Sequence, residues 1–384
     1  MVPPADLPPE FARRRPAPLG SRTVITWRRG EVTAIRRAWR GAVEVTVAVP
    51  EPEPARVVRA IAYPHLTGTP EVGDAVLLNT TAQDMGLGTG GYALVVALPE
   101  RLPADPPAGP GHVVKARYTP MQAVVLGVDE QDSPHHAALS AADSLDGMPV
   151  VVADLHSALP AICAGIRAAR PDARVVYVMT DGGTLPLWFS MTVDTLRTHG
   201  WLAASITVGQ ALGGDLEAVT LHTGLLAARH VERADVAIVA QGPGNLGTGT
   251  RWGFSGVAAG EAINAIATLG GRPVASLRIS DADGRERHRG VSHHSLTAYG
   301  RVALAAADVI VPALPEPLAT RVATDIAPLR ARHRIHIEPT EGLNEALQSS
   351  PARLSTMGRP LEADHAYFLA AAAAGHWAAT HLPT

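Results

Sequence analysis

The feature that most constrains the fold is a change of hydrophobic rhythm near residue 112. After it, apolar runs of strand length alternate with Ala-rich runs of helical spacing, the latter at 158–169, 187–198, 217–230, 256–269 and 296–306. This alternation predicts an α/β domain whose mostly parallel sheet carries helices on both faces. Right-handed crossovers bring the carboxyl ends of such strands to one edge, where open α/β sheets bind ligands. Residues that follow each strand are therefore the first candidates for a site.

The sequence before this change has a different pattern. Short β-type runs separated by turn residues occupy about residues 23–97 and predict a small antiparallel β-barrel or sandwich. A stretch dense in Pro and Gly at 99–112 indicates a domain boundary. We therefore expect a flexible arm at 1–20, a small β domain at 21–105, and an α/β domain with a strand-end ligand site at 112–384.

Composition excludes several classes of protein. Of the 384 residues, 46% are hydrophobic and 18% charged, and the net charge is -3, so neither a disordered chain nor an overall basic field for nucleic acid is expected. Apolar stretches are shorter than the roughly 20 residues that cross a bilayer, and no signal peptide is recognisable. The expectation is a cytoplasmic protein without membrane contact. The single cysteine excludes a disulfide framework within the chain.

A glycine-rich loop follows one apolar strand and precedes a helix expected to begin near Ser255. Its glycines allow backbone N–H groups to approach an anion at the start of that helix. The alternative is a glycine-lined turn that tight packing requires. The candidate ligand-binding residues in this loop are Gly242, Gly244, Asn245, Gly247, Thr248, Gly249, Thr250 and Arg251.

The segment 281–295 is the richest in chemistry, and two functional interpretations compete there. In the first, carboxylates and imidazoles hold a divalent metal; its candidate ligands are Asp281, Asp283, His288 and His293. In the second, arginines bind a phosphate or carboxylate while a histidine transfers a proton; these residues are Arg285, Arg287, Arg289, His288, His293 and His294. The interleaved cations favour the second interpretation, because they raise the cost of adding a divalent ion. A plain solvated loop with histidines capping the next helix is the non-functional alternative.

Two aspartates at other strand ends are candidates to orient a histidine or to accept a proton. Asp154 follows one predicted strand, where it is also a candidate helix N-cap, and Asp181 follows the next. In the β domain, a loop with more glycines than a hairpin needs includes Gly88, Thr89 and Gly90, which we interpret as a lid over the α/β site.

Four unusual strings span most of residues 72–295. They are NTTAQDMGLGTGGY, MTDGG, QGPGNLGTGTRWGFSG and RISDADGRERHRGVSHHS. They resemble an uncharacterised bacterial domain-of-unknown-function family, family 3866, found in actinobacteria and firmicutes. The resemblance marks these loops as characteristic of the family and implies no activity, cofactor or catalytic residue.

These loops predict an enzyme that hydrolyses, or transfers a group on, a phosphorylated or otherwise anionic small metabolite. Signatures for NAD, flavin and PLP are absent, and a divalent metal stays open as a cofactor. One alternative is a non-catalytic nucleotide or metabolite sensor. A third interpretation, less favoured, is a nucleic-acid-associated factor that uses the basic and aromatic run of the β domain. The Ala-rich C-terminal helix at 365–376 suits either internal packing or a homodimer contact.

Overall fold

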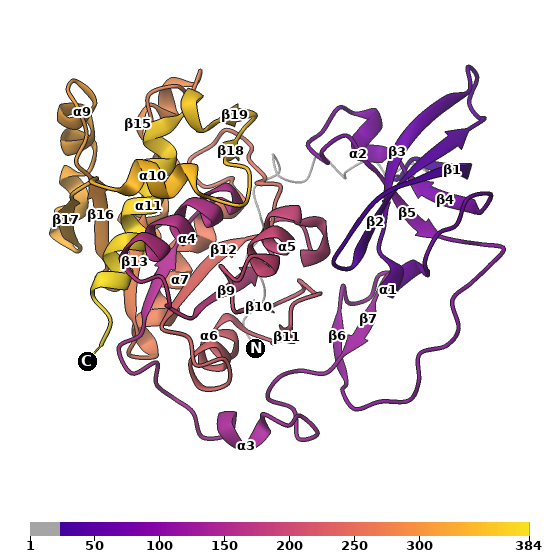
Figure 1. Cartoon of the computed structure of the whole chain (residues 1–384), viewed down its shortest axis with the longest axis horizontal. Coiled ribbons are helices and arrows are strands. Elements are labelled where there is room, and N and C mark those ends of the chain that lie inside the picture. The colour runs from indigo at the N-terminus through magenta and orange to yellow at the C-terminus, as the bar shows by residue number, and fades with distance from the viewer. Residues whose placement is uncertain (1–23, 384) are drawn as a thin grey trace, which may run out of the picture. The chain divides into compact units, whose positions relative to one another are not determined.

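The computed structural model describes residues 24–383, and contacts between them divide the chain into two compact units (Figure 1). One unit runs to Ala38 and includes Ala42–Ala104, and the other comprises Trp39–Gly41 and the chain from Asp105 onward. The arm expected at residues 1–20 lies outside the described residues.

The first unit is a closed β-barrel with strand order β1-β2-β3-β5-β4. Valine dominates its core, as expected of β-branched residues that pack well on a sheet. β2 with β3, β4 with β5 and β1 with β4 pair antiparallel, whereas β3 and β5 pair in parallel. The elements are β1 (Trp27–Trp39), β2 (Ala42–Val49), β3 (Arg56–Ala62), α1 (Pro64–Thr67), β4 (Ala75–Asn79), α2 (Thr81–Asp84) and β5 (Ala93–Ala97).

The second unit is built on an eight-stranded sheet with order β11-β10-β9-β12-β8-β13-β16-β17, and every neighbouring pair is parallel. The strands are β8 (Pro149–Val152), β9 (Val175–Thr180), β10 (Ala204–Thr207), β11 (Leu216–Glu217), β12 (Val236–Gln241), β13 (Arg272–Ser276), β16 (Asp308–Pro312) and β17 (Arg334–Glu338). Three antiparallel pairs lie outside it: β6 (Val113–Lys115) with β7 (Ala123–Val125), β14 (Ile279–Ser280) with β15 (Gly290–Val291), and β18 (Ser355–Thr356) with β19 (Arg359–Pro360).

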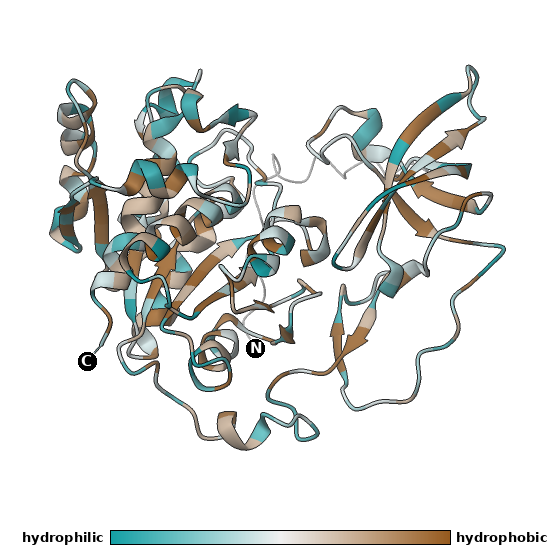
Figure 2. Ribbon diagram, viewed as in Figure 1, coloured by the Kyte–Doolittle hydropathy of each residue, from teal (hydrophilic) through white to brown (hydrophobic). Residues whose placement is uncertain are grey.

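Helices cover both faces of this sheet, which confirms the predicted fold class. The side chains of β12 alternate between the two cores: Ala237 and Val239 join one, and Ile238 and Ala240 the other. Figure 2 shows hydrophobic residues concentrated along the sheet strands. The helices are α3 (His136–Leu139), α4 (Leu159–Ala169), α5 (Met191–Thr198), α6 (Leu221–His230), α7 (Ala258–Thr268), α8 (His293–Thr297), α9 (Leu318–Asp325), α10 (Leu343–Gln348) and α11 (His365–Thr380).

The Ala-rich helix α11 is buried against α4 within its own unit. Small residues let the two backbones approach: a Cβ placed on Gly165 would lie 1.8 Å from the carbonyl oxygen of Ala372. The helix is therefore core, and it gives no support to the homodimer contact considered from the sequence. Among the described residues, no helix is both long and apolar enough to cross a membrane.

The sheet order places a topological switch point at β8. This first strand of the sheet lies between β12 and β13, and the chain extends outward from it in one direction before returning to extend in the other. Connections that leave neighbouring strands toward opposite faces open a crevice at the carboxyl ends. The segments after β8, β12 and β13 therefore border the same region.

Candidate active site

The ends of β8 and β12 are held together by one buried amide. The Gln241 Nε2 group donates to the backbone oxygen of Asp154 at 2.8 Å and to Asn245 Oδ1 at 2.9 Å. The strand end after β8 and the glycine-rich loop after β12 are thus joined by side-chain hydrogen bonds, as the parallel order of the strands requires.

Hydrogen bonds within the glycine-rich loop hold it against the start of the helix that follows. Asn245 Oδ1 accepts hydrogen bonds from the Gly256 N–H at 3.3 Å and from Ser255 Oγ at 3.2 Å, where the short 3-10 helix Ser255–Val257 begins. The Thr248 and Thr250 hydroxyls bond each other at 3.1 Å. The amide oxygen of Asn245 thus accepts one backbone N–H at the start of the helix, and anion binding by this loop stays a prediction.

Asp283 organises the Arg/His-rich segment through ion pairs with three arginines. Its buried carboxylate pairs with Arg278 at 3.0 Å, Arg285 at 2.9 Å and Arg359 at 3.3 Å. Burial alone would raise the pKa of Asp283, but the hydrogen bonds and charge of Arg285 and the charge of Arg278 bring it far below its usual range. Arg289 donates to the Asp283 backbone oxygen at 2.9 Å. Two of the residues predicted as metal ligands are aspartates of this segment. Asp283 forms ion pairs with these arginines, and the side chain of Asp281 is exposed.

Three histidines converge beside this ion-pair cluster. His288 ends the 3-10 turn Glu286–His288, and His293 and His294 open α8. One nitrogen from each of the three lies within 4.8 Å of the other two, and we call the group the histidine cluster. Phe254, which ends the glycine-rich loop, stacks flat on His294 with ring centroids 3.8 Å apart. Two segments that the sequence separates by about 40 positions therefore meet here.

The imidazoles of the histidine cluster are held in their neutral form. Burial, followed by the charge of Arg278, lowers the pKa of His288 to about 3. Burial and the neighbouring histidines lower the pKa of His294 to about 3 as well, and the pKa of His293 falls below its ordinary value chiefly because of burial. Neutral imidazoles keep one nitrogen lone pair available for a proton or a metal.

A pocket of about 410 Å³ opens beside the histidine cluster. Three arginines from three different segments face it, and no carboxylate of residues 24–383 forms an ion pair with any of them, in contrast to Arg285. The lining residues are Gly249, Arg251, Arg287, His293, Leu296, Thr297 and Arg301. The structure thus joins the glycine-rich loop and the Arg/His-rich segment in one electropositive cavity.

The two candidate aspartates lie in different surroundings. Asp154 is buried, its Oδ2 atom has no hydrogen-bond partner within the described chain, and this atom is 4.0 Å from His294 Nδ1. Burial raises the pKa of Asp154, although the charge of Arg278 opposes the rise. Asp181 instead accepts a hydrogen bond from the Gln210 N–H at 2.8 Å. Asp154, rather than Asp181, is therefore the aspartate that the fold brings to a histidine.

The comparisons with known proteins can now be set beside this geometry. The sequence profile of a family described as protein of unknown function (DUF3866) matches residues 59–375. The chain belongs to the DUF3866 family. No curated protein matches the sequence. The matched range contains both the histidine cluster and the arginines of its pocket.

The glycine-rich loop of the β-barrel in this DUF3866 protein closes on its own hairpin. Thr89 Oγ1 donates to the Tyr92 oxygen at 2.9 Å, and Gln83 donates to the Gly91 oxygen at 2.9 Å. Gly90 adopts a left-handed conformation with φ of 63°, which explains one of the glycines locally. A lid role for Gly88, Thr89 and Gly90 remains a prediction.

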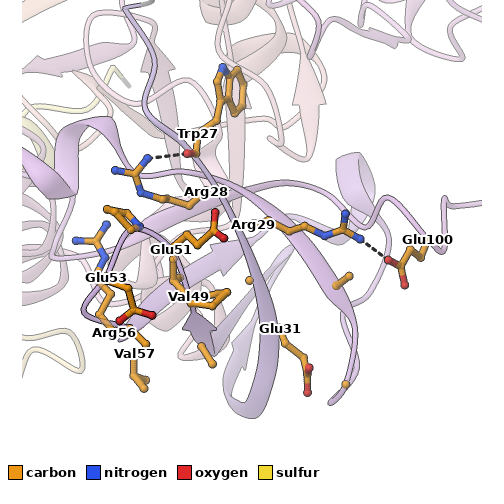
Figure 3. Close-up of a pocket in the computed structure, with 17 residues that line it drawn as sticks. Trp27, Arg28, Arg29, Glu31, Val49, Glu51, Glu53, Arg56, Val57 and Glu100 are labelled. Atoms are coloured by element: carbon orange, nitrogen blue, oxygen red, sulfur yellow. Dashed lines mark hydrogen bonds and ion pairs between the residues drawn. The ribbon is translucent and has the colours of Figure 1, made fainter.

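The barrel also carries a groove of about 1350 Å³, which both acidic and basic side chains line (Figure 3). Arg29 pairs with Glu100 at 2.5 Å, and Arg56 pairs with Asp84 at 2.6 Å. Glu31, Glu51 and Glu53 line the same groove. Arg28, Arg29 and Arg56 line it as well, so the groove carries charges of both signs. The nucleic-acid interpretation stays a prediction.

Sequence reasoning missed several residues of the DUF3866 site. Arg301 stands in a π-helical turn, Ala298–Val302, which the apolar pattern predicted as ordinary helix. Arg278 lies at the end of an apolar run, and Arg359 is 76 positions from its partner Asp283. Only Phe254 and Gln241, which flank the glycine-rich loop, carried a signal, because they adjoin a segment already singled out.

His156, a half-buried histidine in the turn that follows β8, predicts that the stability of the protein falls in acid. His156 bonds Ser190 Oγ at 2.8 Å and the Tyr177 hydroxyl at 3.1 Å, and burial lowers its pKa to about 4. The unfolded chain, with a histidine pKa of about 6.5, takes up the proton first as pH falls. The free energy of unfolding should therefore drop by about 3 kcal/mol on account of this group between pH 6.5 and 4.

Urea unfolding of wild type and His156→Gln at pH 7 and pH 4 measures this contribution. The wild type should be the more stable at pH 7, and its advantage should shrink by about 2–3 kcal/mol at pH 4, while other titrating groups cancel in the difference. An advantage that does not change with pH would show that His156 titrates alike in both states.

Proposed function

We propose that this DUF3866 protein is an enzyme that hydrolyses, or transfers a group from, a small phosphorylated or otherwise anionic metabolite. The observation that carries the proposal is the pocket in which Arg251, Arg287 and Arg301 face the same space beside the histidine cluster. Location in the cytoplasm and assembly as a homodimer remain predictions from the sequence.

The arginines of the pocket favour an anion because no carboxylate of residues 24–383 forms an ion pair with them. Arg278 and Arg285 of the same region are paired with Asp283, whereas the lining residues of the pocket include no carboxylate. Three guanidinium groups around one cavity repel each other until an anion enters. Guanidinium groups bind phosphate and carboxylate oxygens with two parallel hydrogen bonds, which orients as well as attracts the substrate.

The histidine cluster supplies the group that activates water or another acceptor. His293 belongs both to the cluster and to the pocket wall, so a substrate held by the arginines would lie against the cluster. In hydrolysis of a phosphate ester, the water oxygen bonds to phosphorus and the ester P–O bond breaks. The proton given up by the water neutralises the leaving oxygen. The Oδ2 atom of Asp154 lies 4.0 Å from His294 Nδ1, where the carboxyl group would orient that imidazole.

The test is a turnover screen with arginine variants. Purified protein is incubated with nucleotides, sugar phosphates and other phosphate monoesters, and released phosphate and organic product are measured. For any substrate found, Arg251→Ala with Arg287→Ala should lower kcat/KM by about 10²–10⁴-fold, because each lost hydrogen bond to a charged group costs about 1.5–3 kcal/mol.

The matched control is Arg353→Ala, since Arg353 is an exposed arginine that does not line the pocket. Equal kcat/KM in the control and in the double variant would refute the assignment of this pocket. Binding of an anion that depends on Arg251 and Arg287 without any turnover would favour the sensor interpretation instead.

A further inference from the structure

We infer that His288, His293 and His294 form a binding site for one transition-metal ion of the zinc class. The inference does not require the proposed catalysis, because it concerns what the three imidazoles bind. It replaces the ligand set predicted from the sequence, in which two of the four positions were aspartates.

The first support is convergence. One ligand nitrogen from each ring lies within 4.8 Å of the other two, and the ring centroids of His293 and His294 are 4.4 Å apart. Tetrahedral zinc with bonds of about 2.0–2.1 Å places its ligand nitrogens roughly 3.4 Å apart. The separations of up to 4.8 Å must therefore shorten by at most about 1.4 Å, a change that rotation of the three imidazole side chains would provide.

The second support is a set of buried polar atoms without partners. Of the side-chain atoms in this condition among residues 24–383, His293 Nε2, His294 Nδ1 and Asp154 Oδ2 belong to the cluster or to its nearest carboxylate. Buried polar atoms in native proteins nearly always have a hydrogen-bond partner, because an unpartnered group costs about 1–3 kcal/mol. A bound ion would satisfy the imidazole nitrogens and give the Asp154 carboxylate a nearby positive charge.

The third support is that His288 is already oriented as a ligand. Its Nδ1 atom is 2.7 Å from Ser292 Oγ, which leaves Nε2 as the nitrogen able to bind. Metal-binding histidines typically engage their second ring nitrogen in such a hydrogen bond, which fixes both the tautomer and the ring. The stack of Phe254 on His294 restricts the orientation of a second imidazole ring.

The donor set decides the class of ion. Three imidazoles suit zinc and its neighbours cobalt, nickel and copper, whereas calcium and magnesium prefer oxygen ligands. Two other buried acidic groups of the region, Asp283 and Asp364, are both paired with arginines. The same arginines raise the cost of a divalent cation, so the ion must be held by strong metal–nitrogen bonds rather than by charge.

The histidine cluster adjoins the arginine pocket. His293 also lines the arginine pocket, so an ion held by the cluster would lie where it can contact an anion in that pocket. Such an ion polarises a water molecule or a phosphoryl oxygen. In that arrangement the histidines bind the metal ion, and the ion would activate the water. The contact between the ion and a substrate anion rests on the proposed function.

The experiment measures metal uptake without any substrate. Full-length protein is freed of metal with a chelator and titrated with Zn²⁺ and with Co²⁺, and bound metal is quantified after gel filtration. We expect one equivalent per chain, with visible cobalt absorption of a low-symmetry site. His293→Ala is the main variant, since His293 is only partly buried and its replacement should leave the fold intact. Its affinity should fall at least about 100-fold, since loss of an outer-sphere partner alone costs 10–100-fold.

The control His222→Ala removes an exposed histidine of α6 and should bind metal like the wild type. Arg251→Ala with Arg287→Ala should also keep its metal, so a failed turnover screen leaves this result unaffected. No stoichiometric uptake by a folded wild type, or equal affinity in wild type and His293→Ala, would overturn the metal site and leave the cluster as neutral packed imidazoles.

Discussion

Replacing Asp283 with asparagine should destabilise the protein by about 3–5 kcal/mol, more than any other single change of charge near the site. The side chain of Asp283 is almost entirely buried, and that of its partner Arg278 is only 3% exposed. The amide keeps the shape but not the charge, so the guanidinium of Arg278 would stay buried without its counter-ion. Urea unfolding of the metal-free protein measures the loss.

The control for this prediction is Asp281→Asn, two positions earlier in the same segment. Asp281 is exposed, so its replacement should change the free energy of unfolding by less than about 0.5 kcal/mol. If Asp283→Asn were as stable as wild type without metal but bound zinc weakly, the sequence-based set of metal ligands would regain its support. The ion-pair role described above would then be wrong.

Replacing Gly165 with alanine should destabilise the protein by several kcal/mol, although alanine is the better helix former by about 1 kcal/mol. The new Cβ would lie 1.8 Å from the carbonyl oxygen of Ala372, and that oxygen belongs to the backbone of α11 and cannot rotate away. Helices α4 and α11 would have to separate, which opens gaps throughout the core cluster they share. Thermal and urea unfolding report the effect.

Ala168→Gly gives the comparison for helix propensity alone, because Ala168 is an exposed position of the same helix. Its cost should be about 1 kcal/mol. A Gly165→Ala variant as stable as wild type would mean that α4 and α11 lie farther apart than described, and the account of α11 as a core helix would fail.

The fold was largely readable from the sequence because it depends on local periodicity. The strand β12 is continuously apolar since both of its faces are buried, and the barrel strands alternate because one face is. The errors are at element boundaries. The helix expected at 296–306 begins at His293 and ends in the π-helical turn at Val302. Just beyond this end, Asn264 Oδ1 accepts hydrogen bonds from the N–H groups of Leu304 and Ala305.

The site was readable only as far as sequence neighbours determine it. The pair Asp283 and Arg285 is local, because the two residues are two positions apart in the chain. Which arginines remain for a substrate depends on long-range contacts. Arg359 pairs with Asp283 from a position near the carboxyl end of the chain. Arg287 lies within the 3-10 turn Glu286–His288 and lines the pocket.

The glycine-rich loop illustrates the same limit. Its glycines correctly marked a segment at the strand-end crevice, but the sequence does not reveal that Asn245 satisfies the start of the following helix. Only the fold shows that the outer part of the loop, at Gly249 and Arg251, is what faces the pocket. In the same way, the proximity of Asp154 to His294 arises from strand order and not from any local pattern.

The central claim is that one electropositive pocket binds an anion, and the position of phosphate in a crystal of the protein soaked with phosphate tests it most directly. Phosphate should lie within hydrogen-bond distance of Arg251 and Arg287 and beside His293, and it should be absent there in the Arg251→Ala, Arg287→Ala variant. A pocket without phosphate at saturating concentration in wild-type crystals, or phosphate bound only elsewhere on the molecule, would contradict it.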